Sequence, residues 1–302
     1  MSFIASAAAA LPSLLSTAIA AFGFGVFLGD VPAPQSVSDV AASSLEQEIA
    51  ALSPEDREEL FVFVAGNVLH TLYHEGGHML VSELELPVLA QEENAVDNLA
   101  TVSMLADDTE DTDILLISAM VGWFMIAEQD VESMVFYNEH DLNVQRGYQM
   151  LCLMVGADEE TFLELANDLG MPEDRVETCV DEYEQVADSW EYSTEPFWRD
   201  ENAGPGGKIS VVHEKAPDEL KPFALFLKET ELMERVAKEL DSLYELPEKV
   251  TFRADVCEEE NAFWDPGNRE VILCHELVAG FAAVYLADLA YEEDRADLES
   301  SD

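Results

Sequence analysis

The pattern of apolar and polar residues predicts a protein built mainly from α-helices. Ser53 can cap a helix, Pro54 suits its first position, and the two acids that follow favour the positive end of the helix dipole. The apolar residues 60–69 continue this helix into a polar segment around residue 75. Further helices are predicted over residues 91–106, 114–128, 144–155, 159–169, 171–190, 222–244 and 275–291.

The β component is predicted in the last third of the chain. Residues 209–212 look like a short strand, and residues 250–257 alternate between apolar and polar side chains, as a half-buried strand does. Residues 261–265 and 269–274 flank a Pro-Gly turn signal and predict a hairpin. The expected fold class is therefore mainly α with a small β component (α+β), ending in a β-hairpin and a long helix.

The N-terminal segment differs from the rest of the chain. Residues 3–29 carry no charged side chain and are rich in Ala, Leu and Phe. Residues 1–36 are therefore expected to be a signal peptide or an N-terminal membrane anchor with a linker, or else an apolar helix packed on the domain. The remaining residues, 37–302, are expected to form one domain, which a Gly- and Pro-rich stretch could divide into lobes of residues 37–195 and 208–302.

The composition is strongly acidic, with 64 acidic against 14 basic residues and a formal net charge of −50. Binding to phosphate groups requires Lys and Arg, so a nucleic-acid partner is not expected and an anionic membrane surface would repel the protein. A salty medium would screen the repulsion within such a chain. A preference for basic substrates is a weaker interpretation of the same charge.

The sequence His74-Glu75-Gly76-Gly77-His78 reads as the HExxH motif of zinc peptidases. Residues four apart share one face of a helix, so His74 and His78 can both point an imidazole at one Zn²⁺. Glu75 is placed to take a proton from a metal-bound water. Gly76 and Gly77 each cost a helix about 1 kcal/mol relative to alanine, which suggests that another backbone approaches there. The alternative is a polar helix face without a metal.

A catalytic zinc needs a third protein ligand and an open position. The helix predicted to follow carries Glu93 and Asp97, and this layout resembles zincins of the glutamate-ligand type, whose second helix carries Glu-x-x-x-Asp. By that resemblance, Glu93 is the third ligand and Asp97 accepts the spare N–H of a ligand histidine. Glu92 and Asp97 are the competing ligand assignments. His70, one turn earlier on the motif helix, is interpreted as a packed or outer histidine rather than a fourth ligand or a proton relay.

Four cysteines, an even number, fit two disulfides in an exported protein. The local pairing joins Cys152 to Cys179 and Cys257 to Cys274, and free buried thiols are the alternative. In a hairpin centred on the Pro-Gly turn, Cys274 faces a position near Glu259, and Cys257 lies two residues further on the same face of that strand. A bridge between them is therefore geometrically reasonable.

Asn261-Ala262-Phe263-Trp264 resembles the Asn-Ala-Phe-Trp segment of thermolysin-like peptidases. There the segment lies on an edge strand that pairs with the substrate backbone, so the resemblance implies that Asn261 and Ala262 bind substrate. In those enzymes this strand precedes the HExxH helix, whereas here it follows, which implies a permuted order of elements. The alternative is an ordinary hairpin with aromatic core residues.

Several further segments carry a resemblance to one family. They are Leu72–His78, Leu86–Leu89, Glu92-Glu93 with Ala95 and Asp97, Gln145-Arg146 ahead of Leu151–Leu153, Cys179, Asn261-Ala262, Cys274 and Glu276. Together they are similar to the bacterial metallopeptidases of domain of unknown function 4344, which implies a zincin-like, zinc-dependent peptidase. His275 stands where a tyrosine is expected, and it could still donate a hydrogen bond to an oxyanion. His213 and Tyr137 are further candidates for that role, and Arg146 is interpreted as a buried ion-pair partner or a substrate clamp.

The interpretation that combines these features is an exported, periplasmic or secreted zinc peptidase that acts on peptides or proteins. Glu75 is its general base, and His275 is a catalytic candidate. His74, His78 and Glu93 hold Zn²⁺. The alternatives are a zinc-binding module without turnover and an interaction protein that the N-terminal apolar segment anchors to a membrane.

Overall fold

The structure is a computed structural model that describes residues 45–89, 91–107, 109–129, 139–200, 203–204 and 206–300, with the backbone alone for residues 292–300. The apolar N-terminal segment lies outside the described residues, so its role as a signal or an anchor stays a prediction. None of the described helices combines the length and the apolarity that a membrane span requires. The division into two lobes also stays a prediction.

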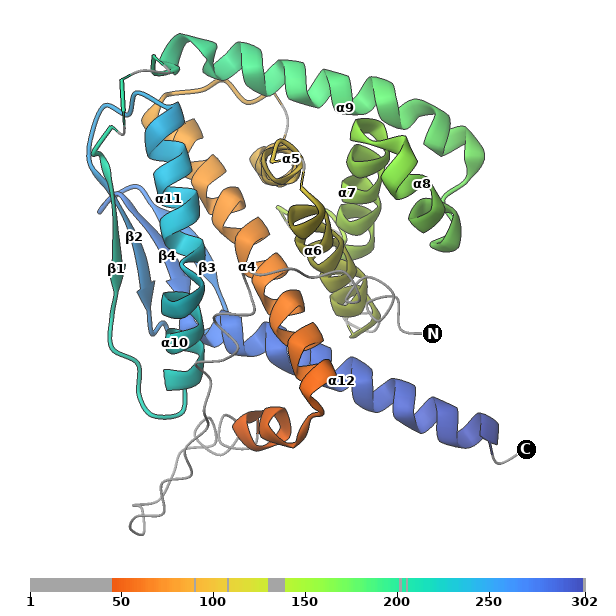
Figure 1. Ribbon diagram of the computed structural model, residues 1–302. Helices are drawn as coiled ribbons and strands as arrows, with labels where there is room; N and C mark the ends of the chain where they lie inside the picture. Colours follow the sequence, from red (N-terminus) through yellow and green to blue (C-terminus); the bar gives the residue numbers. More distant parts are fainter. Residues whose placement is uncertain are drawn as a thin grey trace.

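Helix α4 (Pro54–Glu83) runs through the middle of the molecule and carries the HExxH motif (Figure 1). Its start is capped as predicted, because Ser53 Oγ accepts a hydrogen bond from the backbone N–H of Asp56 at 3.1 Å. Most residues from Glu59 to Leu80 are buried. This explains why the sequence shows a continuous apolar run here, since a helix covered on all sides is apolar all round.

The other helices follow most of the predicted pattern. They are α5 (Glu92–Leu105), α6 (Glu110–Gln129), α7 (Asn143–Ala157), α8 (Glu159–Asp168), α9 (Glu173–Thr194), the 3-10 turn η2 (Glu195–Phe197), α10 (Lys221–Thr230), α11 (Leu232–Leu243) and α12 (His275–Ser300). The prediction of one helix over residues 222–244 was wrong. Glu231 has a left-handed backbone with φ 53°, and this residue separates α10 from α11. Apolar periodicity does not reveal a single residue with a left-handed backbone.

A four-stranded sheet with the order β1-β2-β4-β3 forms the β component. Its strands are β1 (Ile209–His213), β2 (Val250–Asp255), β3 (Ala262–Asp265) and β4 (Glu270–Cys274). Strands β1, β2 and β4 are parallel, whereas β3 pairs antiparallel with β4 in the predicted hairpin. Because β3 has a partner on one side only, it is an edge strand.

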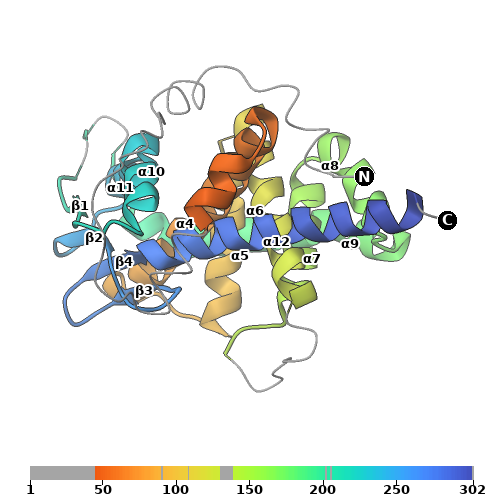
Figure 2. The ribbon, with the colours of Figure 1, turned by 90° about the horizontal axis from the view of Figure 1, so that it is seen from below.

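Helix α4 lies between the sheet and the helices α5 to α9 (Figures 1 and 2). Helix α11 contacts both β1 and α4, so it covers the sheet beside the motif helix. Helix α12 follows β4 directly and passes across α4 and α6, which it contacts (Figure 2). Edge strand β3 also contacts α4, which brings the hairpin to the HExxH motif. The fold is mainly α with a small β component, as the sequence predicted.

Both predicted disulfides are present. Cys152–Cys179 joins α7 to α9, and Cys257–Cys274 joins the segment after β2 to the last residue of β4. No described cysteine is left free. Disulfides persist in oxidising compartments, so this pair of bridges points to an exported location.

The register of the hairpin differs from the prediction. Its centre lies beyond the Pro-Gly pair, so Cys274 stands opposite Asn261 rather than near Glu259. Cys257 is not part of the hairpin: it follows β2, whose Asp255 is the parallel partner of Cys274. The bridge therefore ties two parallel strands together, an arrangement that the spacing of the cysteines does not reveal.

Candidate metal centre

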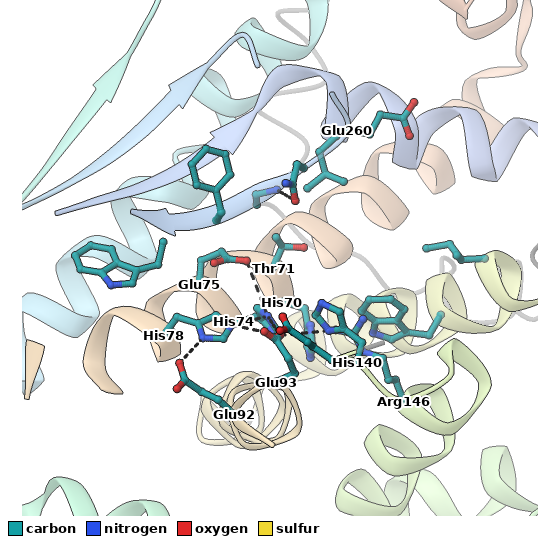
Figure 3. A pocket seen from close by; sticks show the side chains of 18 of the residues that line it. His70, Thr71, His74, Glu75, His78, Glu92, Glu93, His140, Arg146 and Glu260 are labelled. Atoms are coloured by element: carbon teal, nitrogen blue, oxygen red, sulfur yellow. Dashed lines mark hydrogen bonds and ion pairs between the residues drawn. The ribbon is translucent and has the colours of Figure 1, made fainter. Parts of the chain in front are cut away.

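The side chains of the predicted metal site come from α4 and from the first turn of α5. After α4 the chain reverses through Glu85, which has a φ of 52°, and α5 then packs against α4. His74 and His78 lie one turn apart on α4. Glu93 reaches toward both imidazoles from α5 (Figure 3).

Three donor atoms of these residues converge. His74 Nε2 and His78 Nε2 are 3.2 Å apart, and Glu93 Oε2 is 3.3 Å from each of them. In a tetrahedral zinc site with bonds of about 2.0–2.1 Å, neighbouring ligand atoms stand about 3.3 Å apart. The three atoms therefore already have the separation that one zinc ion requires. Within the described part of the chain, they form the one such group of His, Cys, Asp or Glu that could hold a metal ion.

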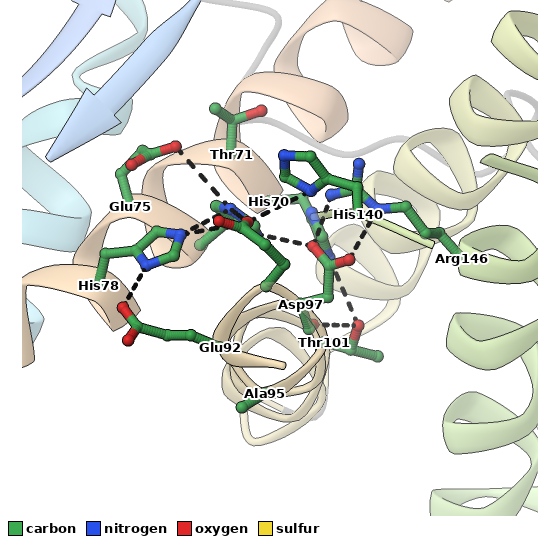
Figure 4. Close-up of polar contacts among 12 residues, drawn as sticks. His70, Thr71, Glu75, His78, Glu92, Ala95, Asp97, Thr101, His140 and Arg146 are labelled. Carbon is green, nitrogen blue, oxygen red and sulfur yellow. Dashed lines mark hydrogen bonds and ion pairs between the residues drawn. The ribbon is translucent and has the colours of Figure 1, made fainter. Parts of the chain in front are cut away.

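The Nδ1 atom of each imidazole is hydrogen-bonded to a carboxylate of α5. Asp97 Oδ1 lies 2.7 Å from His74 Nδ1, and Glu92 Oε1 lies 2.8 Å from His78 Nδ1 (Figure 4). When Nδ1 donates to a carboxylate, the lone pair of Nε2 is free for a metal. Asp97 and Glu92, the two competing ligand assignments, are thus hydrogen-bond partners of the two histidines, whereas Glu93 faces both Nε2 atoms.

A buried arginine completes this support. Arg146 of α7 binds Asp97 with two hydrogen bonds of 2.7 Å, one from Nε and one from Nη2. Its guanidinium also lies 3.5 Å above the ring centre of Trp123. Arg146 therefore serves as an ion-pair partner that orients Asp97, which is the first of its two interpretations from the sequence.

The charges of the site favour a cation. Burial by itself lowers the pKa of His74, but hydrogen bonds to Asp97 and Glu93 outweigh it and raise this pKa to about 9. Burial raises the pKa of both carboxyls, yet the hydrogen bonds from His74 hold each pKa well below its ordinary range. Zinc binds the neutral imidazole, so metal ions and protons compete for these groups.

Glu75 lies next to the imidazoles, on the side of the sheet (Figure 3). Its side chain is buried, and Oε1 is 3.9 Å from His74 Nε2. Burial raises the pKa of Glu75 above its ordinary value, although the neighbouring histidines lower it in part. The backbone N–H of Trp264 in β3 donates a hydrogen bond to this carboxylate. The predicted general base therefore lies beside the edge strand.

The open edge of β3 faces the same site. Cys274 donates its N–H to the carbonyl of Asn261 at 3.1 Å, and bonded and non-bonded pairs alternate along an antiparallel ladder. Ala262 and Trp264 therefore turn their backbone groups outward, away from β4. The Trp264 N–H meets Glu75, and the Ala262 N–H is bonded to Oδ1 of Asn261 at 2.9 Å.

These groups open into one cavity of about 950 Å³. Its lining combines the motif helix, the start of α5, the loop before α7, the hairpin and α12. The lining residues are His70, Thr71, His74, Glu75, His78, Gln91, Glu92, Glu93, Trp123, Ile126, Glu139, His140, Arg146, Glu260, Asn261, Ala262, Phe263, Trp264, Pro266, Leu277 and Phe281. Asn261 and Ala262, the predicted substrate-binding residues, are thus on the cavity wall.

Two further histidines lie beside the metal group. His70 is buried and lies 3.4 Å from the hydroxyl of Thr101, and burial lowers its pKa to about 4, so its ring is neutral at pH 7. His140, which the sequence analysis missed, places Nδ1 3.2 Å from Glu93 Oε2. It belongs to a polar loop without periodicity, so no sequence signal marked it.

The predicted oxyanion donors lie elsewhere. His275 is completely buried at the start of α12 and does not line the cavity, because β4 passes into the helix at this residue. His213 is bonded to Glu234 of α11 at 2.8 Å and is also absent from the lining. Tyr137 lies outside the described residues. The structure therefore does not bring His275 or His213 to the metal group.

The two glycines of the motif make room for side chains rather than for a backbone, contrary to the prediction. A Cβ atom added to Gly77 would lie 2.9 Å from Cβ of Val96, on the helix that carries Glu93. A Cβ atom added to Gly76 would lie 2.7 Å from Cδ1 of Leu240, the flexible end of a side chain. Gly77 therefore sets how closely α5 approaches α4.

We expect Gly77→Ala to weaken zinc binding and to lower the free energy of unfolding by about 1–3 kcal/mol, because the new methyl group pushes α5 from α4. Gly76→Ala is the matched control. Leu240 can move aside, and alanine favours the helix by about 1 kcal/mol, so its net effect is small. Urea unfolding and the zinc dissociation constant of both variants test this expectation, and equal losses in the two would contradict it.

His74, His78 and Glu93 form a group that could hold a metal ion, and two imidazoles of an HExxH helix with a carboxylate of the next helix are a donor set typical of metallopeptidases. The comparison with family models agrees. The chain belongs to the family of domain of unknown function 4344, which is described as "putative metallopeptidase" and matches residues 37–193 and 213–301. No curated protein and no solved structure matches the chain.

Proposed function

We propose that this protein is an exported zinc-dependent peptidase that hydrolyses peptide bonds with Glu75 as its general base. The observation that carries the proposal is the convergence of two imidazole nitrogens and one carboxylate oxygen, 3.2–3.3 Å apart, beside this buried carboxylate. Membership in a family of metallopeptidases supports the same reaction class.

The donor set suits zinc. His74, His78 and Glu93 would hold the ion through one atom each, and three protein ligands leave a position open. When bound, zinc polarises a carbonyl group and makes water more acidic. Asp97 and Glu92 keep the two imidazoles turned toward the shared centre.

Glu75 handles the proton of the reaction. Its carboxylate accepts a proton from the attacking water and then delivers it to the leaving amine. The raised pKa of this buried group makes it a stronger base than an exposed glutamate. The backbone of Trp264 in β3 interacts with this carboxylate, which places the general base beside the edge strand.

The substrate backbone is proposed to add to the open edge of β3. Ala262 turns its N–H and C=O outward there, and an extended peptide can pair with such groups. The Ala262 N–H donates a hydrogen bond to the side chain of Asn261, and a substrate carbonyl would replace this side chain as the acceptor. The scissile bond would then run past Glu75, because Trp264 of the same strand contacts that carboxylate.

His140 is the proposed donor to the oxyanion. It lines the cavity, 38% of its side chain is exposed, and Nδ1 lies 3.2 Å from the ligand oxygen of Glu93. The atoms that converge on the metal position belong to His74, His78 and Glu93, and His140 is not among these residues. It therefore stands beside the metal position rather than in it. A donor placed there would stabilise the charge that develops on the carbonyl oxygen.

Hydrolysis of a broad peptide library tests the proposal. We expect the zinc-loaded protein to cleave peptides, to stop when a chelator removes the metal and to recover when zinc is returned. If the fully loaded protein cleaves nothing, a zinc-binding module without turnover replaces the peptidase. If cleavage persists without metal, the assigned role of the metal centre is wrong.

A further inference from the structure

One carboxylate of the cavity has no role in the metal site. Glu260 lies before β3 and lines the cavity together with Leu277 and Phe281 of α12. Figure 3 shows Glu260 on the other side of the cavity from Glu92, apart from the metal-binding side chains. It therefore marks a separate part of the same cavity.

The side chain of Glu260 rests on α12. A Cβ atom added to Gly280 would lie 2.6 Å from Glu260 Oε2 and 2.9 Å from its Cδ. Glycine at this position leaves the room that the carboxylate occupies. Leu277 and Phe281, one turn before and one residue after Gly280, place apolar surface on the adjoining cavity wall.

The charge of this carboxylate is not balanced. No residue in the described part of the chain makes a hydrogen bond or an ion pair with Glu260. Arg146 is the one Arg or Lys among the described residues that line the cavity, and its ion pair is with Asp97 rather than with Glu260. An unpaired negative charge beside apolar walls therefore remains for a ligand.

We propose that Glu260, Leu277 and Phe281 form a subsite for an arginine or lysine side chain of the peptide substrate, an inference that rests on the proposed peptidase function. These side chains combine an apolar stem with a cationic end. The stem packs on the two apolar residues while the cation pairs with the carboxylate. Arginine is favoured, because its guanidinium can bind a carboxylate through two hydrogen bonds and stack on a phenyl ring.

Other side chains match this surface less well. Leucine would cover the apolar walls but leave the carboxylate next to apolar surface without a partner. Aspartate or glutamate would be repelled by the like charge. Because Glu260 is exposed at the cavity rim, the pairing is screened by water and salt, so the preference is modest and weakens with ionic strength.

Peptides that differ only in the charge of one side chain test the proposal. Arginine and its neutral isostere citrulline are placed in turn at each position of one cleaved peptide. We expect kcat/KM to favour arginine about 3- to 10-fold at one position and Glu260→Gln to remove that preference. Glu258→Gln, which takes the same charge from the same loop but does not line the cavity, keeps it. No preference at any position, or a preference that survives in Glu260→Gln, overturns the proposal.

A binding measurement separates this inference from the proposed function. The affinities of the arginine and citrulline peptides are measured by calorimetry on Glu75→Gln, with and without the Glu260→Gln change. If the wild-type protein hydrolyses both peptides equally and binding shows no difference, the subsite is wrong and the peptidase stands. If no peptide is cleaved but the arginine peptide binds more tightly in a Glu260-dependent manner, the subsite stands and the peptidase is wrong.

Discussion

Glu75→Gln is expected to lower kcat for peptide hydrolysis by about 10²–10⁴-fold while the protein keeps its zinc. The amide has the shape of the carboxylate, and it can still lie beside His74 and receive the Trp264 N–H. It cannot accept a proton, so the attacking water loses its base. Steady-state kinetics on a cleaved peptide and metal analysis of the same preparation measure both effects.

The control for this variant is Glu55→Gln, which removes one negative charge from the exposed first turn of the same helix. Its kcat should equal that of the wild-type protein. If Glu75→Gln keeps its activity, another group is the base and the assignment fails. If it loses its zinc, the effect on kcat says nothing of proton transfer, and the metal site itself depends on Glu75.

Glu93→Gln is expected to reduce zinc affinity far more than Glu92→Gln, although the two residues are neighbours. Glu93 Oε2 is 3.3 Å from both ligand nitrogens, so its charge and its donor atom are lost from the metal position. Glu92 touches only the outer nitrogen of His78, and 44% of its side chain is exposed. Loss of such an outer partner typically costs about 10- to 100-fold in metal affinity, and an exposed one belongs at the lower end.

Competition with a chromophoric chelator gives the zinc dissociation constants of both variants and of the wild-type protein at one pH. Circular dichroism verifies that each variant is folded, because neither glutamate is part of the apolar core. If Glu92→Gln loses more affinity than Glu93→Gln, the ligand assignment must be exchanged. Equal losses would mean that the two carboxylates share the ion.

The hairpin lies far from the HExxH motif in the chain but beside it in space. In this chain β3 follows the motif helix, yet it contacts α4 and brings the backbone of Trp264 to Glu75. The Cys257–Cys274 bridge ties the segment between β2 and β3 to the end of β4. The strand that would receive the substrate is thus held by its pairing with β4 and, through the segment before it, by this bridge.

Local patterns in the sequence predicted much of the fold and part of the site. Helix periodicity placed most helices, the spacing of His74 and His78 placed both on one face, and the Pro-Gly turn predicted the hairpin. These predictions depend on residues a few positions apart, whose geometry the backbone itself dictates. Where a single left-handed residue interrupted a helix, as at Glu231, the pattern had no signal for it.

By itself, then, the sequence determined the HExxH helix, the helix-rich class and the pairs of cysteines, because each follows from local spacing or from a short list of partners. Only the tertiary structure decided that His140 joins Glu93, that β3 reaches Glu75 and that Glu260 rests on α12 beside Phe281. These contacts join residues far apart in the chain. They arise from how whole helices and strands pack, and no local periodicity encodes them.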